Sequence, residues 1–287
     1  MVILFLSLLA SLSVGFLIKL LKINNLFDFF VLIANNYLIA FLLGIFLFDI
    51  RIDSFVASHF PYLHVVFLGV FMPTVFIFLN KSLKTSGLAR TDIFQRLSLI
   101  IPLILSFWFF KEEFTLIKLF AIILTFISIV LLLYKKSTNN GNFNLFYLLV
   151  VFFSYGIIDT LFKIIATNPS INYTSVLVLI FGLCLLTTFI GLFFTYKNTV
   201  LKPKLLYFGW LMGFLNFFNI YFYMKAHKIF ADNPTLVFIS MNLGVIIGGS
   251  LIGKFYFKEK FSKLTLIGIL IAVLTIILLA LIQLKIL

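Results

Sequence analysis

Acidic residues and cysteine are scarce in this sequence. Asp and Glu number 9 against 22 Lys and Arg, and charged residues make up only 11% of the chain. Soluble domains are typically about 25% charged, so the composition excludes an ordinary water-soluble fold. The single cysteine, Cys184, lies inside an apolar run. A lone buried thiol excludes a disulfide framework and a cysteine-ligated metal cluster.

The sequence also lacks the motifs of a membrane-embedded enzyme, for example one that acts on lipid. Such an enzyme needs a cluster of acids, histidines or metal ligands. The chain has 3 histidines and no pair of them at the HxxxH spacing, and it shows neither a paired-Asp motif nor a nucleophile elbow. We therefore expect no enzymatic activity, no catalytic residue, no metal site and no cofactor.

Apolar residues, in contrast, are abundant. They make up 63% of the chain, and the mean hydropathy is +1.22. A membrane-spanning helix needs roughly 20 apolar residues, and ten segments of about that length can be delimited. They are 2–22, 26–48, 60–80, 87–110, 115–134, 143–166, 173–196, 204–224, 233–257 and 263–284. The net charge of +13 comes mainly from lysines in the short gaps between these segments. This pattern favours contact with anionic lipid head groups and not with nucleic acid.

The two halves of the chain match each other in sequence. A polar linker over 137–142 separates residues 1–136 from residues 143–287. Three ordered stretches correspond across it, at an offset that grows from 141 to 147 residues: 13–22 with 154–163, 69–84 with 213–228, and 110–119 with 257–266. Because five spans is an odd number, the second unit enters the membrane from the opposite side. The sequence predicts an all-α polytopic membrane protein with ten transmembrane helices arranged as two inverted five-helix repeats.

The third match contains all three glutamates of the chain. The cassette FKEEF occupies 110–114 and FKEKF occupies 257–261, each between the fourth and fifth span of its half. Thr115 and Ser262 follow the cassettes at positions typical of helix N-caps. We expect two corresponding corners, with the glutamates favoured by the positive end of the helix that follows.

These features resemble the EamA branch of the drug/metabolite transporter superfamily. The resemblance covers essentially the whole chain and is carried by the segments 80–114 and 238–270, each an apolar run followed by a glutamate and a polar helix start. It implies a ten-span transporter for amino acids, nucleotide-linked metabolites, cofactors or toxic compounds. Small multidrug antiporters of the superfamily use a glutamate in the first span. This chain has no acid there, so we do not expect proton/drug antiport by that route.

The fourth span carries the densest set of polar residues. Ionisable groups cost roughly 2.5–3.5 kcal/mol at mid-span and are functional candidates by default. Asp92 and Arg96 are four residues apart and can pair on one helix face. Such a pair either lowers the cost of insertion or leaves Arg96 facing a central cavity, where it attracts a carboxylate or phosphate. At the offset of 147, Gln95 corresponds to Asn242, whereas Arg96 corresponds to Leu243. The positive charge at this position is therefore present in the first half of the chain and not in the second.

Further polar residues recur along other spans, where they act either as interhelical hydrogen-bonding residues or as the lining of a polar cavity. Asp159 is the other acid deep in a span, with Tyr155 and Lys163 on the same helix face. The predicted substrate-binding residues are Gln95, Arg96, Tyr155, Asp159, Asn216, Asn219, Tyr223, Asn242, Asn35 and Asn36.

The sequence thus predicts a secondary transporter that works by alternating access on a small polar metabolite, for example an amino acid or an organic anion. Its site is expected at the midplane between the two repeats. The alternative is a non-transporting membrane scaffold or lipid scramblase. We expect a multi-pass protein of the cell inner (plasma) membrane, a monomer or homodimer, in contact with anionic lipids. The lysine bias places both termini outside, while the family resemblance places them in the cytoplasm.

Overall fold

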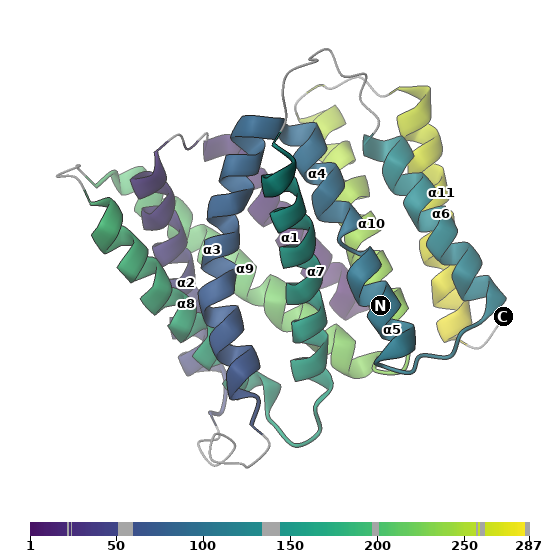
Figure 1. Ribbon diagram of the computed structural model, residues 1–287, viewed down its shortest axis with the longest axis horizontal. Helices are drawn as coiled ribbons and strands as arrows, with labels where there is room; N and C mark the ends of the chain where they lie inside the picture. Colours follow the sequence, from purple (N-terminus) through teal and green to yellow (C-terminus); the bar gives the residue numbers. More distant parts are fainter. Residues whose placement is uncertain are drawn as a thin grey trace. The chain divides into compact units, whose positions relative to one another are not determined.

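The computed structural model describes residues 1–21, 23, 25–50, 60–133, 144–196, 201–256, 258 and 262–284. Every regular element in these ranges is a helix (Figure 1). The helices are α1 Val2–Leu21, α2 Leu26–Leu47, α3 Tyr62–Ser86, α4 Leu88–Leu97, α5 Ile100–Trp108, α6 Leu116–Leu133, α7 Leu145–Thr167, α8 Tyr173–Thr195, α9 Pro203–Ile229, α10 Pro234–Phe255 and α11 Lys263–Gln283.

Nine stretches of the described chain are long and apolar enough to cross a membrane. One of them, Arg90–Trp108, combines α4 and α5, and α1 carries a shorter apolar stretch, Val2–Ile18. The prediction of an all-α polytopic membrane protein is confirmed. The expected fourth span over 87–110 corresponds to the stretch Arg90–Trp108, within which the chain forms two helices, α4 and α5. The predicted linker 137–142 lies outside the described residues.

Large apolar side chains cover much of the helix surface. Phe46 and Trp108 are each 80% exposed, and Phe193 is 79% exposed. In water, surface left exposed in this way forgoes about 25 cal/mol of stabilisation for each Å² of apolar area. A bilayer removes that penalty, so these side chains are suited to contact lipid tails.

The chain forms two compact units that do not coincide with its halves. Unit 1 consists of Met1–Thr74 and Leu161–Lys228, and unit 2 of Val75–Thr160 and Ile229–Leu287. Each unit therefore combines helices from both halves, and α3 and α7 each contribute to both units. The repeat boundaries at 1–136 and 143–287 are a different division and stay a prediction.

Unit 1 is organised around the pair α2 and α8, which lie side by side (Figure 1). Phe30, near the start of α2, packs on Gly191, near the end of α8. Phe41, further along α2, packs on Gly182, which lies nearer the start of α8. The two helices are therefore antiparallel, with aromatic rings set into the gaps that glycine leaves.

Unit 2 is organised in the same way around α6 and α11 (Figure 1). Ser128, towards the end of α6, donates a hydrogen bond of 2.8 Å to the carbonyl of Gly268, towards the start of α11. In the predicted duplication α2 corresponds to α8 and α6 to α11. Antiparallel packing of corresponding helices agrees with an inverted repeat, which itself stays a prediction.

The two glutamate-containing corners share backbone geometry. Lys111 and Lys258, which correspond at the offset of 147, both adopt positive φ angles, 53° and 55°. A lysine whose backbone lies in the left-handed region costs free energy. The same strained φ angle at both positions therefore indicates the same tight turn. The predicted N-caps are confirmed: Thr115 accepts from the Lys118 amide at 3.2 Å, and Ser262 accepts from the Thr265 amide at 3.0 Å. The rest of the second cassette lies outside the described residues.

Candidate functional site

The fourth span is interrupted next to Arg96 by a short turn at Ser98 and Leu99, whose backbone angles stay in the right-handed helical region, and we call this turn the break. Proline has no N–H and clashes with the carbonyl four residues before it, and Pro102 does this to Ser98. The Ser98 carbonyl instead accepts from the Ile101 amide at 3.0 Å, and the Ser98 hydroxyl donates to the Gln95 carbonyl at 2.6 Å. The sequence analysis missed this break, although Pro102 was the signal for it.

A glycine of α7 packs directly on the break. A Cβ atom at Gly156 would lie 2.9 Å from the Ser98 carbonyl oxygen and 2.6 Å from Cδ1 of Ile101. Only glycine allows so close an approach at this point. The contact places the flanking part of α7, with Tyr155 and Asp159, beside the broken helix.

Charged and polar side chains predicted for the site gather here within unit 2. Nε of Arg96 lies 3.5 Å from Oδ1 of Asp92, which confirms the predicted pair. Tyr155 lies within electrostatic range of Arg96, Asp92 and Asp159. Nε of Arg96 is sealed from solvent and makes no hydrogen bond in the part of the chain that the structure describes. Its link to Asp92 is therefore a charge interaction without a well-aligned hydrogen bond.

The predicted pair of side-chain amides in unit 2, Gln95 and Asn242, makes no hydrogen bond with the side chains around Arg96 among the described residues. Asn242 of α10 donates to the Phe238 carbonyl of its own helix at 3.1 Å. Gln95 is half-buried on α4, and no hydrogen bond joins it to Asn242 among the described residues. Only the predicted repeat relates the position of Gln95 to that of Asn242.

Two predicted asparagines of unit 1 hold helices together. Asn35 of α2 donates to the Val31 carbonyl at 2.9 Å and accepts from the Trp210 indole N–H of α9 at 2.9 Å. Asn219 of α9 accepts from the Ser7 hydroxyl of α1, at 3.1 Å on its side chain and 2.9 Å on its carbonyl. Both amides are occupied by protein partners, as packing residues usually are.

The other three predicted residues of unit 1 differ from one another. Asn36 is fully buried, and neither polar atom of its side chain has a hydrogen-bond partner among the described residues. Asn216 is half-buried on α9. Tyr223 is 8% exposed, and its ring meets that of His227 edge-on, with centroids 4.7 Å apart.

Unit 1 also buries two basic residues that the sequence analysis did not select. Lys163 is 1% exposed and His227 is fully buried, and the two interact electrostatically. The histidine was set aside because it has no HxxxH partner. No pattern within α7 or α9 shows that these side chains are enclosed.

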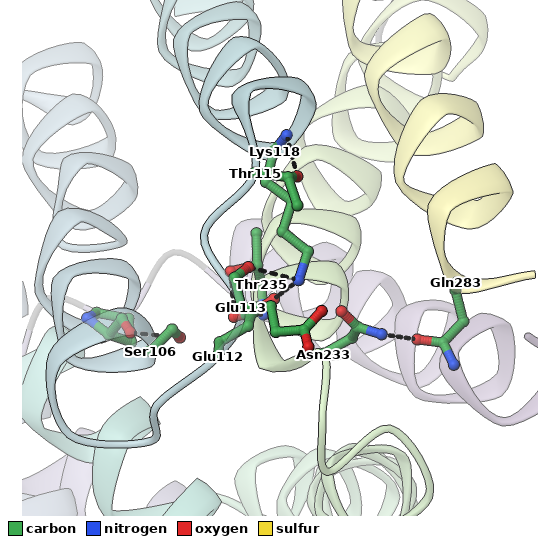
Figure 2. A network of polar contacts seen from close by, with 9 residues as sticks. Ser106, Glu112, Glu113, Thr115, Lys118, Asn233, Thr235 and Gln283 are labelled. Atoms are coloured by element: carbon green, nitrogen blue, oxygen red, sulfur yellow. Dashed lines mark hydrogen bonds and ion pairs between the residues drawn. The ribbon is translucent and has the colours of Figure 1, made fainter. Parts of the chain in front are cut away.

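The first glutamate corner holds a closed polar network in unit 2, which Figure 2 shows. The Glu112 carboxylate lies 3.1 Å from Nζ of Lys118 and accepts from the hydroxyl and amide of Thr235, at 2.6 and 3.2 Å. Glu112 and Lys118 are 6% and 5% exposed. Beside them Asn233 donates to Gln283 at the end of α11. The interaction of the glutamates with the positive end of the next helix stays a prediction; the Glu112 carboxylate pairs with Lys118 near the start of α6 and also caps the start of α10 through the Thr235 amide.

Comparison with known proteins identifies the family. A profile of the EamA-like transporter family matches residues 1–134. An uncharacterized protein of Haemophilus influenzae (strain ATCC 51907 / DSM 11121 / KW20 / Rd) is 36% identical over 271 residues, which cover 92% of each chain. The chain belongs to the EamA-like transporter family. This EamA-like protein is thus a member of the drug/metabolite transporter superfamily, as its sequence indicated. A crystal structure of a protein that is 14% identical matches with a TM-score of 0.68, over 99% of this chain and 97% of that chain, and shares its fold.

Proposed function

We propose that this EamA-like protein is a secondary transporter, working by alternating access, for a small polar metabolite with an anionic group. The observation that carries the proposal is Arg96: a guanidinium inside a membrane span, at a break in the helix, with a sealed Nε that makes no hydrogen bond among the described residues. An ionisable side chain inside a membrane span is a functional candidate by default, because placing it there is costly.

The charges around Arg96 indicate which solutes suit the site. A guanidinium binds carboxylates and phosphates through paired N–H donors. Asp92 lies 3.5 Å from it, and Asp159 lies with it around Tyr155. One cation together with two acids favours a solute that carries both a negative and a positive group, such as an amino acid. The same site also admits an organic anion, if the anion takes the place of Asp92 next to Arg96.

We further propose that the protein acts in the cell inner membrane, as a monomer or homodimer in contact with anionic lipids, and that it is a carrier and not an enzyme. The lysines between spans support the lipid contact, since basic residues next to a membrane are attracted to anionic head groups.

The test is a binding and transport assay on purified protein. A thermal-shift screen against amino acids, nucleotides and organic anions identifies a ligand, because a ligand that binds only the folded state raises the melting temperature. Uptake of that ligand into proteoliposomes is then measured for Arg96→Ala and Asp159→Asn. The matched controls are Arg90→Ala, in the same helix, and Asp28→Asn, at the start of α2.

We expect Arg96→Ala and Asp159→Asn to abolish uptake while their abundance in the membrane stays at the wild-type level. Arg96→Lys keeps the charge but loses the paired geometry, so its uptake should fall between those of wild type and Arg96→Ala. Wild-type flux in Arg96→Ala, or equal losses in the Arg90→Ala control, would contradict the proposal.

A further inference from the structure

Helix α3 contains a proline at the point where it leaves one compact unit for the other. The boundary between unit 1 and unit 2 falls between Thr74 and Val75. Pro73 lies inside the helix directly before that boundary. Because proline has no N–H, the carbonyl of Gly69, four residues earlier, lacks its helical donor. The helical ladder is therefore interrupted at the boundary.

The carbonyl that Pro73 leaves free has another partner in unit 1. The hydroxyl of Thr187, on α8, lies 3.1 Å from the Gly69 carbonyl and 2.8 Å from the Leu183 carbonyl of its own helix, so its single proton is shared between these two acceptors. The two helices also touch here, since a Cβ atom at Gly69 would lie 2.3 Å from Cβ of Leu183. The part of α3 before the proline is thus fixed to α8.

The part of α3 after the proline is fixed to unit 2. The Ser82 hydroxyl, which is fully buried, lies 2.8 Å from the Thr91 hydroxyl of α4. Ser86, the last residue of α3, accepts from the Asn144 amide just before α7 at 3.2 Å. Each end of α3 therefore belongs firmly to its own unit, and the interruption lies between them.

The chain changes units at two other points, one within α7 and one at the end of α9. In α7 the boundary follows Thr160, whose hydroxyl donates back to the Gly156 carbonyl at 2.8 Å. Such back-bonding tends to bend helices. The third boundary, between Lys228 and Ile229, falls at the last residue of α9. The chain thus passes from one unit to the other at a proline in α3, within the continuous helix α7 and at the end of α9.

We infer that Pro73 is a hinge, about which α3 bends when unit 1 and unit 2 move relative to each other. The Thr187 hydroxyl assists the bend, because the proton that it shares with Leu183 gives the Gly69 carbonyl a partner in place of a helical N–H. The role of this hinge in a transport cycle rests on the proposed function. The hinge itself is a property of the chain and can be measured without a substrate.

The first experiment measures the motion. Spin labels are placed on Leu201 of unit 1 and Leu266 of unit 2, which are 53% and 52% exposed, in a Cys184→Ala background. Pro73→Ala gives residue 73 an N–H that can bond Gly69, so we expect a narrower distribution of label distances. Pro203→Ala is the control, because Pro203 is the first residue of α9, where no helical hydrogen bond is lost.

The second experiment measures flux and ligand binding in proteoliposomes. For Pro73→Ala we expect flux to fall roughly threefold to tenfold, the change that one added hydrogen bond produces on a barrier. Ligand affinity should stay within about twofold, since Pro73 is not one of the residues proposed to bind the ligand. If wild-type protein carries no flux at all, the proposed function fails, while the distance measurement still decides the hinge.

A third variant keeps the inference testable if the Pro73→Ala protein does not accumulate in the membrane. Thr187→Val removes the donor to Gly69 while the proline stays, so the label distances should broaden. In a Pro73→Ala background the same valine should have little effect, because the new N–H replaces the hydroxyl. Distance distributions equal to wild type in both Pro73→Ala and Thr187→Val would overturn the inference.

Discussion

Replacing Glu112 by glutamine should destabilise the protein far more than replacing an acid in an exposed ion pair. Glutamine keeps the shape of the side chain and one acceptor oxygen, so it can still accept from Thr235. It presents an NH₂ group or a neutral oxygen to Lys118, whose ammonium is then buried without a counter-charge. The variant therefore isolates the charge of the pair from its packing.

The magnitude follows from how deeply the pair is enclosed. Side-chain exposure is 6% for Lys118 and 0% for Glu112. Removing one partner of such a buried pair typically costs about 3–5 kcal/mol, because an uncompensated charge remains. The control pair is Lys202 with Asp28, whose side chains are 62% and 11% exposed, so water reaches the ammonium end of this pair. Losing an ion pair that water reaches costs only about 0–1 kcal/mol, so Asp28→Asn should be close to wild type.

The free energy of unfolding can be measured by titrating detergent-solubilised protein with dodecyl sulfate and following the fluorescence of Trp108 and Trp210. We expect Glu112→Gln to lose about 3 kcal/mol or more. The double variant Glu112→Gln/Lys118→Met buries no charge at the corner, so it should be more stable than Glu112→Gln alone. The reasoning is refuted if Glu112→Gln is as stable as Asp28→Asn, or if the double variant shows no recovery.

Three further substitutions test contacts at the candidate site and in unit 1. Gly156→Ala brings a methyl group to the Ser98 carbonyl and should lower stability by about 1–3 kcal/mol, as overpacking does; an unchanged melting temperature would contradict the close contact. Asn36→Leu removes a buried amide without a described partner and should raise stability by about 1 kcal/mol, which the same titration measures. Asn35→Ala leaves the Trp210 indole without its acceptor and should lose about 1 kcal/mol, with a shift in tryptophan emission.

Local patterns in the sequence predicted the features that depend on neighbouring residues. Apolar runs of helical length predicted the spans, because a helix that crosses a bilayer must be apolar along its whole length. The spacing of Asp92 and Arg96 predicted their pair, and the residues after the two cassettes predicted the N-caps at Thr115 and Ser262. Each of these depends on contacts within about one helical turn.

The features that the sequence did not predict depend on contacts between distant segments. Glu112 and Thr235 are 123 residues apart, and no pattern around either residue shows that one caps the helix of the other. The same holds for the burial of Lys118 in the first turn of α6. The break at Ser98 is a different case, since Pro102 is visible in the sequence. It was missed because prolines occur in intact spans as well, and the packing of Gly156 decides the outcome.

The mixed composition of the two units has a consequence for biogenesis. When the ribosome has released α1 to α6, α2 still lacks α8 and α6 still lacks α11. Neither unit can complete its packing at that stage, and the Glu112 carboxylate cannot bind Thr235 until α10 has been synthesised. The first half, although it is the part that the family profile matches, is therefore not an independent folding domain. Made as separate polypeptides, the two halves should each be degraded when produced alone, and each should be rescued by synthesis of the other in the same cell.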